Sequence, residues 1–265
     1  MDLIQVIVLA LVQGLTEILP ISSSGHLILV PWLFGWPDQG LAFDVAMHMG
    51  TLAALLWYFR EEVVRYALAF MRSLKLRALD AESRLAWALV IGTIPAAVAG
   101  LLLEDAASTT LRTATVVATT TVLYALLLGA ADLLGAKRRD ETTVTLRDGL
   151  IIGAAQALAL IPGPSRSGST ITAGLALGLD RKGAARFSFL LSLPITAAAG
   201  VLEGTELVRS GAPQAWGEMA LAAAVAGLAT YACVAELLRF IQQIGMWPFV
   251  AYRLLLGALL WTALT

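Results

Sequence analysis

Two short polar stretches interrupt long apolar segments of this sequence, and both carry residues that could do chemistry. The stretch from Gln13 to His26 contains a carboxylate, three consecutive serines and an imidazole, and the stretch from Pro162 to Thr170 places an arginine among hydroxyl groups. Polar groups are costly in hydrocarbon, so such clusters inside a membrane segment mark a functional site by default. Together these groups indicate an anionic substrate that carries phosphate groups.

Each stretch combines a turn with the start of a new half-helix. Gln13 and Glu17 are four residues apart and share one face of a helix, which Pro20 is expected to stop. The turns that follow predict nests of backbone N–H groups for an anion, helped by the helix dipole. The groups available are Ser22, Ser23, Ser24 and Gly25 in the first turn, and Ser165, Ser167, Gly168 and Thr170 beside Arg166 in the second.

The elements that position these stretches follow from composition. The chain has 265 residues, 58% of them hydrophobic and 14% charged, and a mean hydropathy of +0.80. A soluble domain carries about 25% charged residues, so the sequence predicts an all-α polytopic membrane protein. No zinc, P-loop, dinucleotide or nucleic-acid signature is present in the sequence. The segments with the length of a full span are 42–59, 85–103, 114–134, 184–202, 218–238 and 247–264.

The two interrupted regions are predicted to be re-entrant helical hairpins. The segment 3–19 is just long enough to span the bilayer, but the segment after its break and both arms of the second region are too short. Broken backbone at membrane depth is tolerated only where protein or a water-filled cavity satisfies its hydrogen bonds. The first hairpin has arms 3–19 and 26–36 around a break at 20–25, and the second has arms 149–161 and 170–179 around a break at 162–168.

The two breaks are related by a shift of 143 residues. This shift places Gln13 on Gln156 and Ser22 on Ser165, and it also superimposes Ser24 on Ser167 and Gly25 on Gly168. Three predicted spans separate the hairpins, an odd number, so the halves of the chain are expected to form an inverted-topology repeat. We predict a single membrane-embedded domain, 1–265, with repeat halves of about 1–134 and 147–265. Paired breaks of this kind are typical of a binding site near the midplane.

Lys and Arg predict the orientation. They gather in the connecting segments 60–84, 135–148 and 180–186, which we interpret as loops, whereas the segments 104–113 and 203–217 hold only Arg112 and Arg209. The basic set is assigned to the cytoplasm. Both termini and the opening of the first hairpin are then expected on the outer side, and the second hairpin opens toward the cytoplasm.

The segments Gln-Gly-Leu-Thr-Glu-Ile-Leu-Pro-Ile-Ser-Ser-Ser-Gly-His and Pro-Gly-Pro-Ser-Arg-Ser-Gly-Ser-Thr resemble the signature regions of the undecaprenyl-diphosphate phosphatase family, the bacitracin-resistance type. The resemblance covers essentially the full length. It implies an enzyme of the bacterial inner membrane that hydrolyses undecaprenyl diphosphate to undecaprenyl phosphate and inorganic phosphate. This reaction returns the lipid carrier to peptidoglycan and cell-envelope synthesis and confers bacitracin resistance. The implied partners are the isoprenoid diphosphate substrate and the lipid bilayer, with no nucleic acid. The oligomeric state stays open, and a homodimer is one of the alternatives.

The resemblance also implies roles for individual residues. Glu17 resembles the family's essential carboxylate, and Gln13 its partner in a (Glu/Gln)-x-x-x-Glu motif, so this chain has one carboxylate there rather than two. Ser23 resembles the proposed nucleophile, His26 the motif histidine and Arg166 the phosphate-binding arginine. The family is activated by divalent cations such as Mg²⁺, for which Glu17 is the expected protein ligand.

These residues allow more than one mechanism. Ser23 could attack the terminal phosphorus while His26 or Glu17 accepts its proton, or His26 or a water molecule could be the nucleophile while Ser23 only positions the substrate. The alternative function is a polyprenyl-phosphate lipid flippase or transporter, because inverted repeats with broken helices are also transporter architecture. Outside the two stretches, His48 could line the pocket, although packing between helices is favoured, and we expect Glu236 and Arg253 to snorkel or pair with each other.

Overall fold

The structure is a computed structural model that describes residues 1–108, 114–209 and 215–264. Arg112, used in the charge argument, lies outside these residues. Across the described ranges the regular secondary structure is helical apart from one isolated bridge, between Arg139 and Leu179. The elements are α1 (Leu3–Thr16), α2 (Ser23–Phe34), α3 (Leu41–Tyr58), α4 (Arg60–Leu76), α5 (Ala81–Ser108), α6 (Ala114–Leu134), the 3₁₀ turn η1 (Glu141–Thr143), α7 (Leu146–Leu158), α8 (Arg166–Ala176), α9 (Arg181–Arg209), α10 (Trp216–Ile244) and α11 (Trp247–Leu264).

Five of these helices, α3, α5, α6, α9 and α10, are long and apolar enough to cross a membrane. They coincide with five of the six predicted spans and confirm a polytopic membrane protein. The sixth predicted span corresponds to α11, whose described apolar part, Trp247–Thr262, falls short of that length. The largest apolar core joins α3, α5, α9 and α10 and contains Leu55, Phe59, Phe187 and Leu191.

The prediction that 60–84 is a loop was wrong, because most of it forms α4. This helix is amphipathic: the buried Tyr66, Ala69 and Ser73 are spaced three and four residues apart and face α5. Its acidic first turn and basic last turn suit the helix dipole. The charges that suggested a loop therefore lie on the exposed face of a helix.

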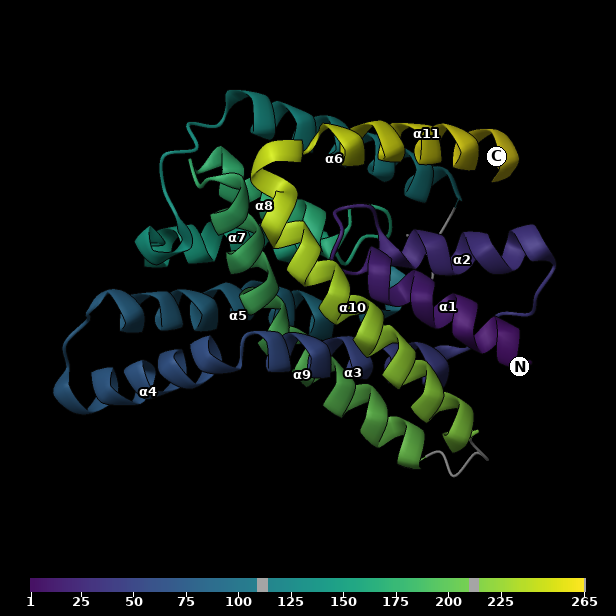
Figure 1. Cartoon of the computed structure of the whole chain (residues 1–265), viewed down its shortest axis with the longest axis horizontal. Coiled ribbons are helices and arrows are strands. Elements are labelled where there is room, and N and C mark those ends of the chain that lie inside the picture. The colour runs from purple at the N-terminus through teal and green to yellow at the C-terminus, as the bar shows by residue number, and fades with distance from the viewer. Residues whose placement is uncertain (109–113, 210–214, 265) are drawn as a thin grey trace.

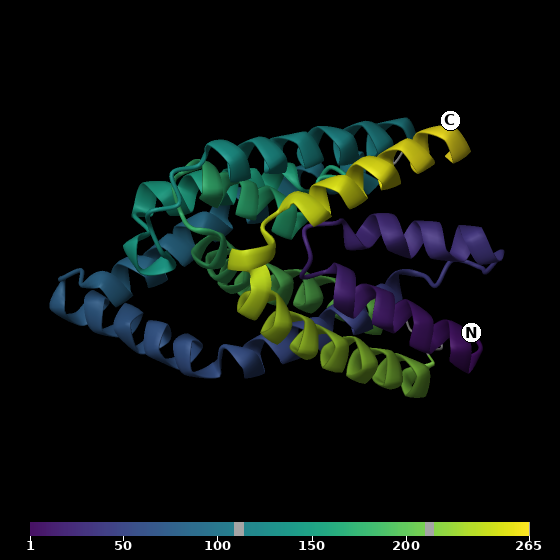
Figure 2. The same cartoon turned by 45° about the horizontal axis from the view of Figure 1, so that its top comes forward.

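Two helical hairpins, α1 with α2 and α7 with α8, lie at the predicted positions in the chain and toward opposite ends of the molecule. Figures 1 and 2 show α1 and α2 side by side near the two termini, α7 and α8 toward the other end, and the tips of both pairs meeting in the middle. The tips touch directly, because Ser167 Oγ donates a 3.1 Å hydrogen bond to the Leu19 carbonyl. The breaks are shifted toward the N-terminus relative to the prediction, so that Ser23, Ser24 and Gly25 begin α2 and Arg166 begins α8.

The tips share an unusual backbone geometry at equivalent positions. Ser22 precedes α2 with φ of 75° and Ser165 precedes α8 with φ of 67°, a left-handed conformation that is uncommon outside glycine. Each serine also pairs with the serine two residues on, Ser22 with Ser24 at 3.4 Å and Ser165 with Ser167 at 3.2 Å. Residues that the 143-residue shift superimposes in the sequence therefore also have similar local structure.

Close helix packing at small residues holds the hairpins in the bundle. On α3, a Cβ added at Gly50 would lie 2.0 Å from the Ala223 carbonyl oxygen of α10, and on α1 one added at Gly14 would lie 2.4 Å from the Ala226 carbonyl oxygen. Small residues let helix backbones approach in this way where lipid offers no hydrophobic drive for association. The helix α10 is therefore the support against which both α1 and α3 are set.

Gly50→Ala is expected to destabilise the protein by about 1–3 kcal/mol, because the new methyl group meets backbone that cannot move aside. The measurement is thermal unfolding of the purified protein in detergent. Gly100→Ala on α5 is the matched control, since no atom lies within 4 Å of its added Cβ, and better helix propensity should leave stability unchanged or raised. Equal melting temperatures for the two variants would contradict the packing argument.

Candidate active site

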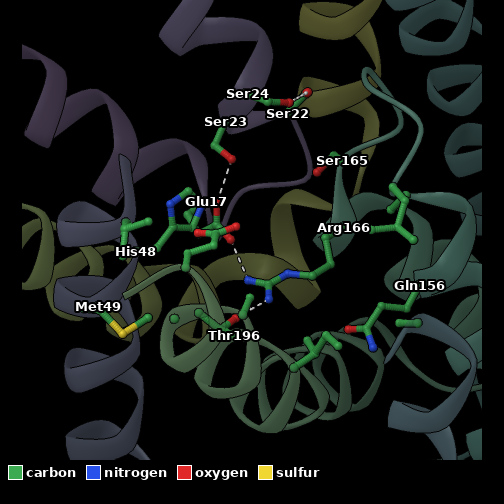
Figure 3. A pocket seen from close by; sticks show the side chains of 18 of the residues that line it. Glu17, Ser22, Ser23, Ser24, His48, Met49, Gln156, Ser165, Arg166 and Thr196 are labelled. Carbon is green, nitrogen blue, oxygen red and sulfur yellow. Dashed lines mark hydrogen bonds and ion pairs between the residues drawn. The ribbon is translucent and has the colours of Figure 1, made fainter. Parts of the chain in front are cut away.

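A cavity of about 290 Å³ lies where the two hairpin tips meet, and both breaks contribute to its wall. Glu17 and Ser23 come from the first hairpin, and Ser165 and Arg166 come from the second. Residues of α3, α5 and α9 complete the wall, most of them apolar: Val45, Met49, Ala96, Ile195, Ala199 and Gly200. The site thus joins one polar half, made by the breaks, to an apolar half made by membrane-spanning helices (Figure 3).

Glu17 is the centre of the polar half. It directly follows α1 and is 9% exposed. Ser23 Oγ donates to Glu17 Oε2 at 2.6 Å, Gln13 Nε2 donates to the same oxygen at 3.2 Å, and Arg166 Nη2 donates to Oε1 at 2.5 Å. A carboxylate held this way can accept the serine proton while the arginine stabilises its charge.

Arg166 is held in place from its other side by α9. Its Nη1 donates to the Thr196 hydroxyl and, at 3.5 Å, to the Ser192 carbonyl. Its side chain remains 24% exposed, toward the cavity. The guanidinium is therefore fixed by Glu17 and α9 but still presents charge to an anion, as Figure 3 shows.

The structure brings six of the predicted site residues to the cavity and places the others behind it. Those at the cavity wall are Glu17, Ser22, Ser23, Ser24, Ser165 and Arg166. Behind it lie Gln13, Gly25, His26, Ser167, Gly168 and Thr170. Several of the second group support the first: Gln13 bonds Glu17, Ser167 bonds the opposite tip, and Thr170 pairs with Ser188 of α9 at 2.6 Å.

His26 has both ring nitrogens engaged by protein partners. Its Nδ1 lies 2.7 Å from the Ser22 carbonyl, which can only accept, so Nδ1 carries the proton. Nε2 then accepts from the Tyr252 hydroxyl at 2.5 Å. In this arrangement His26 holds the carbonyl of the left-handed residue Ser22 and supports the turn that leads to Ser23.

The polar cavity residues outside the predicted site set are His48, Gln156, Thr196 and Glu203. For His48 the structure favours the position at the pocket over packing between helices, because its Nε2 lies 3.7 Å from Glu17 Oε2 and its side chain is 36% exposed. Gln156 was marked by the shift that places it on Gln13. For Thr196 no signal existed, because its role depends on how α9 lies beside Arg166.

Arg253 was expected to snorkel or pair with Glu236, and this expectation was also wrong. Arg253 is fully buried, and its guanidinium lies between the two breaks. Nη1 donates to the Pro20 carbonyl at 3.4 Å and Nη2 to the Gly163 carbonyl at 3.1 Å. Glu236 instead lies 4.0 Å from Arg239, on the exposed face of α10.

Arg253→Lys is expected to lower turnover by about tenfold or more, because a single ammonium group cannot satisfy two carbonyls in the geometry of the guanidinium fork. The measurement is the steady-state rate of phosphate release, with thermal unfolding alongside. Arg239→Lys is the control, since Arg239 is exposed on α10 and outside the cavity. An Arg253→Lys variant with unchanged turnover would contradict a role in joining the tips.

The residues present fit a divalent cation that is shared with a phosphorylated ligand. Among the described residues, no group of three or more His, Cys, Asp or Glu side chains forms a complete cage. Mg²⁺, however, binds through one or two protein oxygens and completes its shell with phosphate and water. The Glu17 carboxylate supplies one oxygen, and the neighbouring Gln13 Oε1 is buried without a hydrogen-bond partner in the described part of the chain.

Comparison with known proteins identifies the family. A family model described as bacitracin resistance protein BacA matches residues 6–259. The chain belongs to the BacA family. Relatives over nearly the whole length include proteins named undecaprenyl-diphosphatase from Nitrosococcus oceani, 53% identical over 260 residues and 98% of each chain, and from Thioalkalivibrio sulfidiphilus, 54% identical over 261 residues and 98% of each chain. A third, from Chromohalobacter salexigens, is 52% identical over 265 residues, 99% of this chain and 100% of the relative.

The BacA match covers the whole cavity. Every residue of the cavity wall, from Glu17 to Glu203, and the buried Arg253 fall within residues 6–259. The family resemblance noted in the sequence is confirmed.

Proposed function

We propose that this chain hydrolyses undecaprenyl diphosphate to undecaprenyl phosphate and inorganic phosphate, returning the lipid carrier to cell-envelope synthesis and conferring bacitracin resistance. The observation that carries the proposal is the hydrogen-bonded chain of Ser23, Glu17 and Arg166 at the cavity. It provides a nucleophile, a base and an anion-binding cation together. The names of the relatives supply the identity of the lipid.

The geometry supports a mechanism with Ser23 as nucleophile. Ser23 Oγ bonds to the terminal phosphorus as its proton passes to Glu17 Oε2, and the bond from that phosphorus to the bridging oxygen breaks. The electron pair leaves with undecaprenyl phosphate. Water then attacks the phosphoserine, releases inorganic phosphate and restores the serine. Because the ring nitrogens of His26 are engaged, Glu17 is the proton acceptor that this arrangement favours.

Charge on the diphosphate is offset by the second hairpin and by the turn of the first. Arg166 faces the cavity, and the N–H groups that begin α2 have no side-chain cap from Ser22, so they remain available to phosphate oxygens. A Mg²⁺ ion held by Glu17 and Gln13 would supply Lewis-acid neutralisation of diphosphate charge when bound.

We place the chain in the bacterial inner membrane as one domain, 1–265, with both termini outside. Three segments that were assigned to the cytoplasm meet at one end of the molecule, where Arg186 bonds to Glu62 and Glu141, and the N- and C-termini lie together at the other end (Figures 1 and 2). On this orientation, the first hairpin opens outward and the second inward, as two inverted halves of about 1–134 and 147–265. The cavity is lined by residues of a single chain, and the homodimer stays a prediction.

The test is phosphate release by the purified protein from a long-chain polyprenyl diphosphate in detergent, with Mg²⁺ and with a chelator. We expect release that depends on Mg²⁺, and acid quenching followed by mass spectrometry should find phosphate on Ser23. Absence of release, together with movement of polyprenyl phosphate across vesicles, would overturn the enzyme assignment in favour of the flippase. Release without phosphoserine would overturn the nucleophile but leave the reaction in place.

A further inference from the structure

The Gln156 side chain is polar, buried and without a partner at the wall of the cavity. It lies on α7 one turn before the second break and is 3% exposed. Neither Nε2 nor Oε1 makes a hydrogen bond to any described residue. Buried amides in proteins are almost always paired, so a side chain that keeps both atoms free beside a cavity is suited to bind a ligand.

Comparison with Gln13 explains why Gln156 is free. The two glutamines are equivalent in the hairpins, but Gln13 is followed four residues later by Glu17 and donates to it at 3.2 Å. The residue four positions after Gln156 is Leu160, which also lines the cavity and offers no acceptor. The amide that serves a carboxylate in the first hairpin is therefore available to another acceptor in the second.

The position of Gln156 indicates which acceptor that is. Figure 3 shows Ser23 and Gln156 on opposite sides of the cavity, with the Arg166 side chain between them and the Gln156 amide directed toward Arg166 and Thr196. In-line phosphoryl transfer places the attacking oxygen and the leaving oxygen on opposite sides of the phosphorus. A group across the cavity from Ser23 therefore faces the leaving phosphate.

We propose that Gln156 binds the phosphate that stays on the lipid, with Nε2 donating to one of its oxygens. This inference rests on the proposed diphosphatase activity and adds a substrate-binding residue to it. Gln156 would help to align the leaving group opposite Ser23.

The test is Gln156→Met, which keeps the length and flexibility of the side chain but removes both polar atoms. Loss of one hydrogen bond to a charged group predicts a fall in kcat/KM of roughly ten- to a hundredfold. The melting temperature without substrate should stay the same or rise, because no protein hydrogen bond is lost and a desolvated polar group is removed. A fall in kcat/KM without a fall in melting temperature distinguishes a ligand-binding residue from one that only stabilises the fold.

Gln243→Met, on the exposed C-terminal end of α10, is the control and should change neither quantity. Gln156→Glu should lose more activity than Gln156→Met, because its carboxylate faces the anionic phosphate. If Gln156→Met were as active as wild type, or lost stability in step with activity, the inference would fail while the diphosphatase assignment stood. Inactive wild-type protein would instead overturn the proposed function itself.

Discussion

Glu17→Gln is expected to lower phosphate release by about 10³-fold or more, the largest loss that we predict for a single substitution. The amide keeps the size of the carboxylate but cannot accept the Ser23 proton. It also leaves the Arg166 guanidinium without its anionic partner, which lies 2.5 Å away. The measurement is single-turnover phosphate release at saturating lipid diphosphate.

Stability separates loss of chemistry from loss of structure in this variant. Breaking a buried ion pair costs about 3–5 kcal/mol, and we expect about 2–3 because Arg166 faces the cavity. Asp132→Asn is the matched control. Asp132 Oδ1 lies 2.6 Å from Arg181 Nε, and neither residue lines the cavity. It should lose stability while the folded fraction keeps its turnover. If Glu17→Gln retained a tenth of wild-type activity, Glu17 would not be the base.

Arg166→Lys is the second large effect, with an expected loss of about 10²–10³-fold in kcat/KM. The lysine keeps the positive charge but cannot contact Glu17, the Thr196 hydroxyl and a phosphate oxygen with one planar group. Competition by inorganic diphosphate should weaken in parallel, because the same guanidinium binds the anion. Both quantities are measured in the phosphate-release assay.

Arg147→Lys, exposed on the first turn of α7, should leave rate and competition unchanged. A double variant, Glu17→Gln with Arg166→Met, adds a sharper comparison. Removing both charges should recover stability relative to Glu17→Gln alone, because no uncompensated charge remains, yet it should recover no activity. Recovery of activity would mean that the ion pair is structural and that catalysis uses other groups.

The parts of this protein that the sequence predicted well are those set by local chemistry. Pro, Gly and Ser are concentrated at the two breaks, and such a concentration is typical of an interrupted helix, so both breaks and the cluster around Glu17 and Arg166 could be foreseen. The segment containing α4 was misinterpreted because exposed charges on an amphipathic helix resemble those of a loop. Its buried Tyr66 and Ala69, at helical spacing, were the overlooked signal.

The residues that could not be predicted depend on contacts between distant segments. Arg253 reaches both breaks only because α11 is placed beside them, and nothing near it in the sequence indicates carbonyl partners at Pro20 and Gly163. Thr196 and His48 likewise contribute through the approach of α9 and α3 to Glu17 and Arg166. Local pattern could identify the groups that do chemistry, but not those that hold them.

The place of Arg253 in the chain has a consequence for the order in which the protein is made. Its helix, α11, follows both hairpins and all the long helices in the chain, yet the guanidinium bonds to the carbonyls of both hairpin tips. A nascent chain can therefore insert both hairpins and every long helix before the tips are joined. Only a chain that extends through α11 contains Arg253, and termination before α11 yields a membrane protein that has the catalytic side chains but lacks the residue that joins the two breaks.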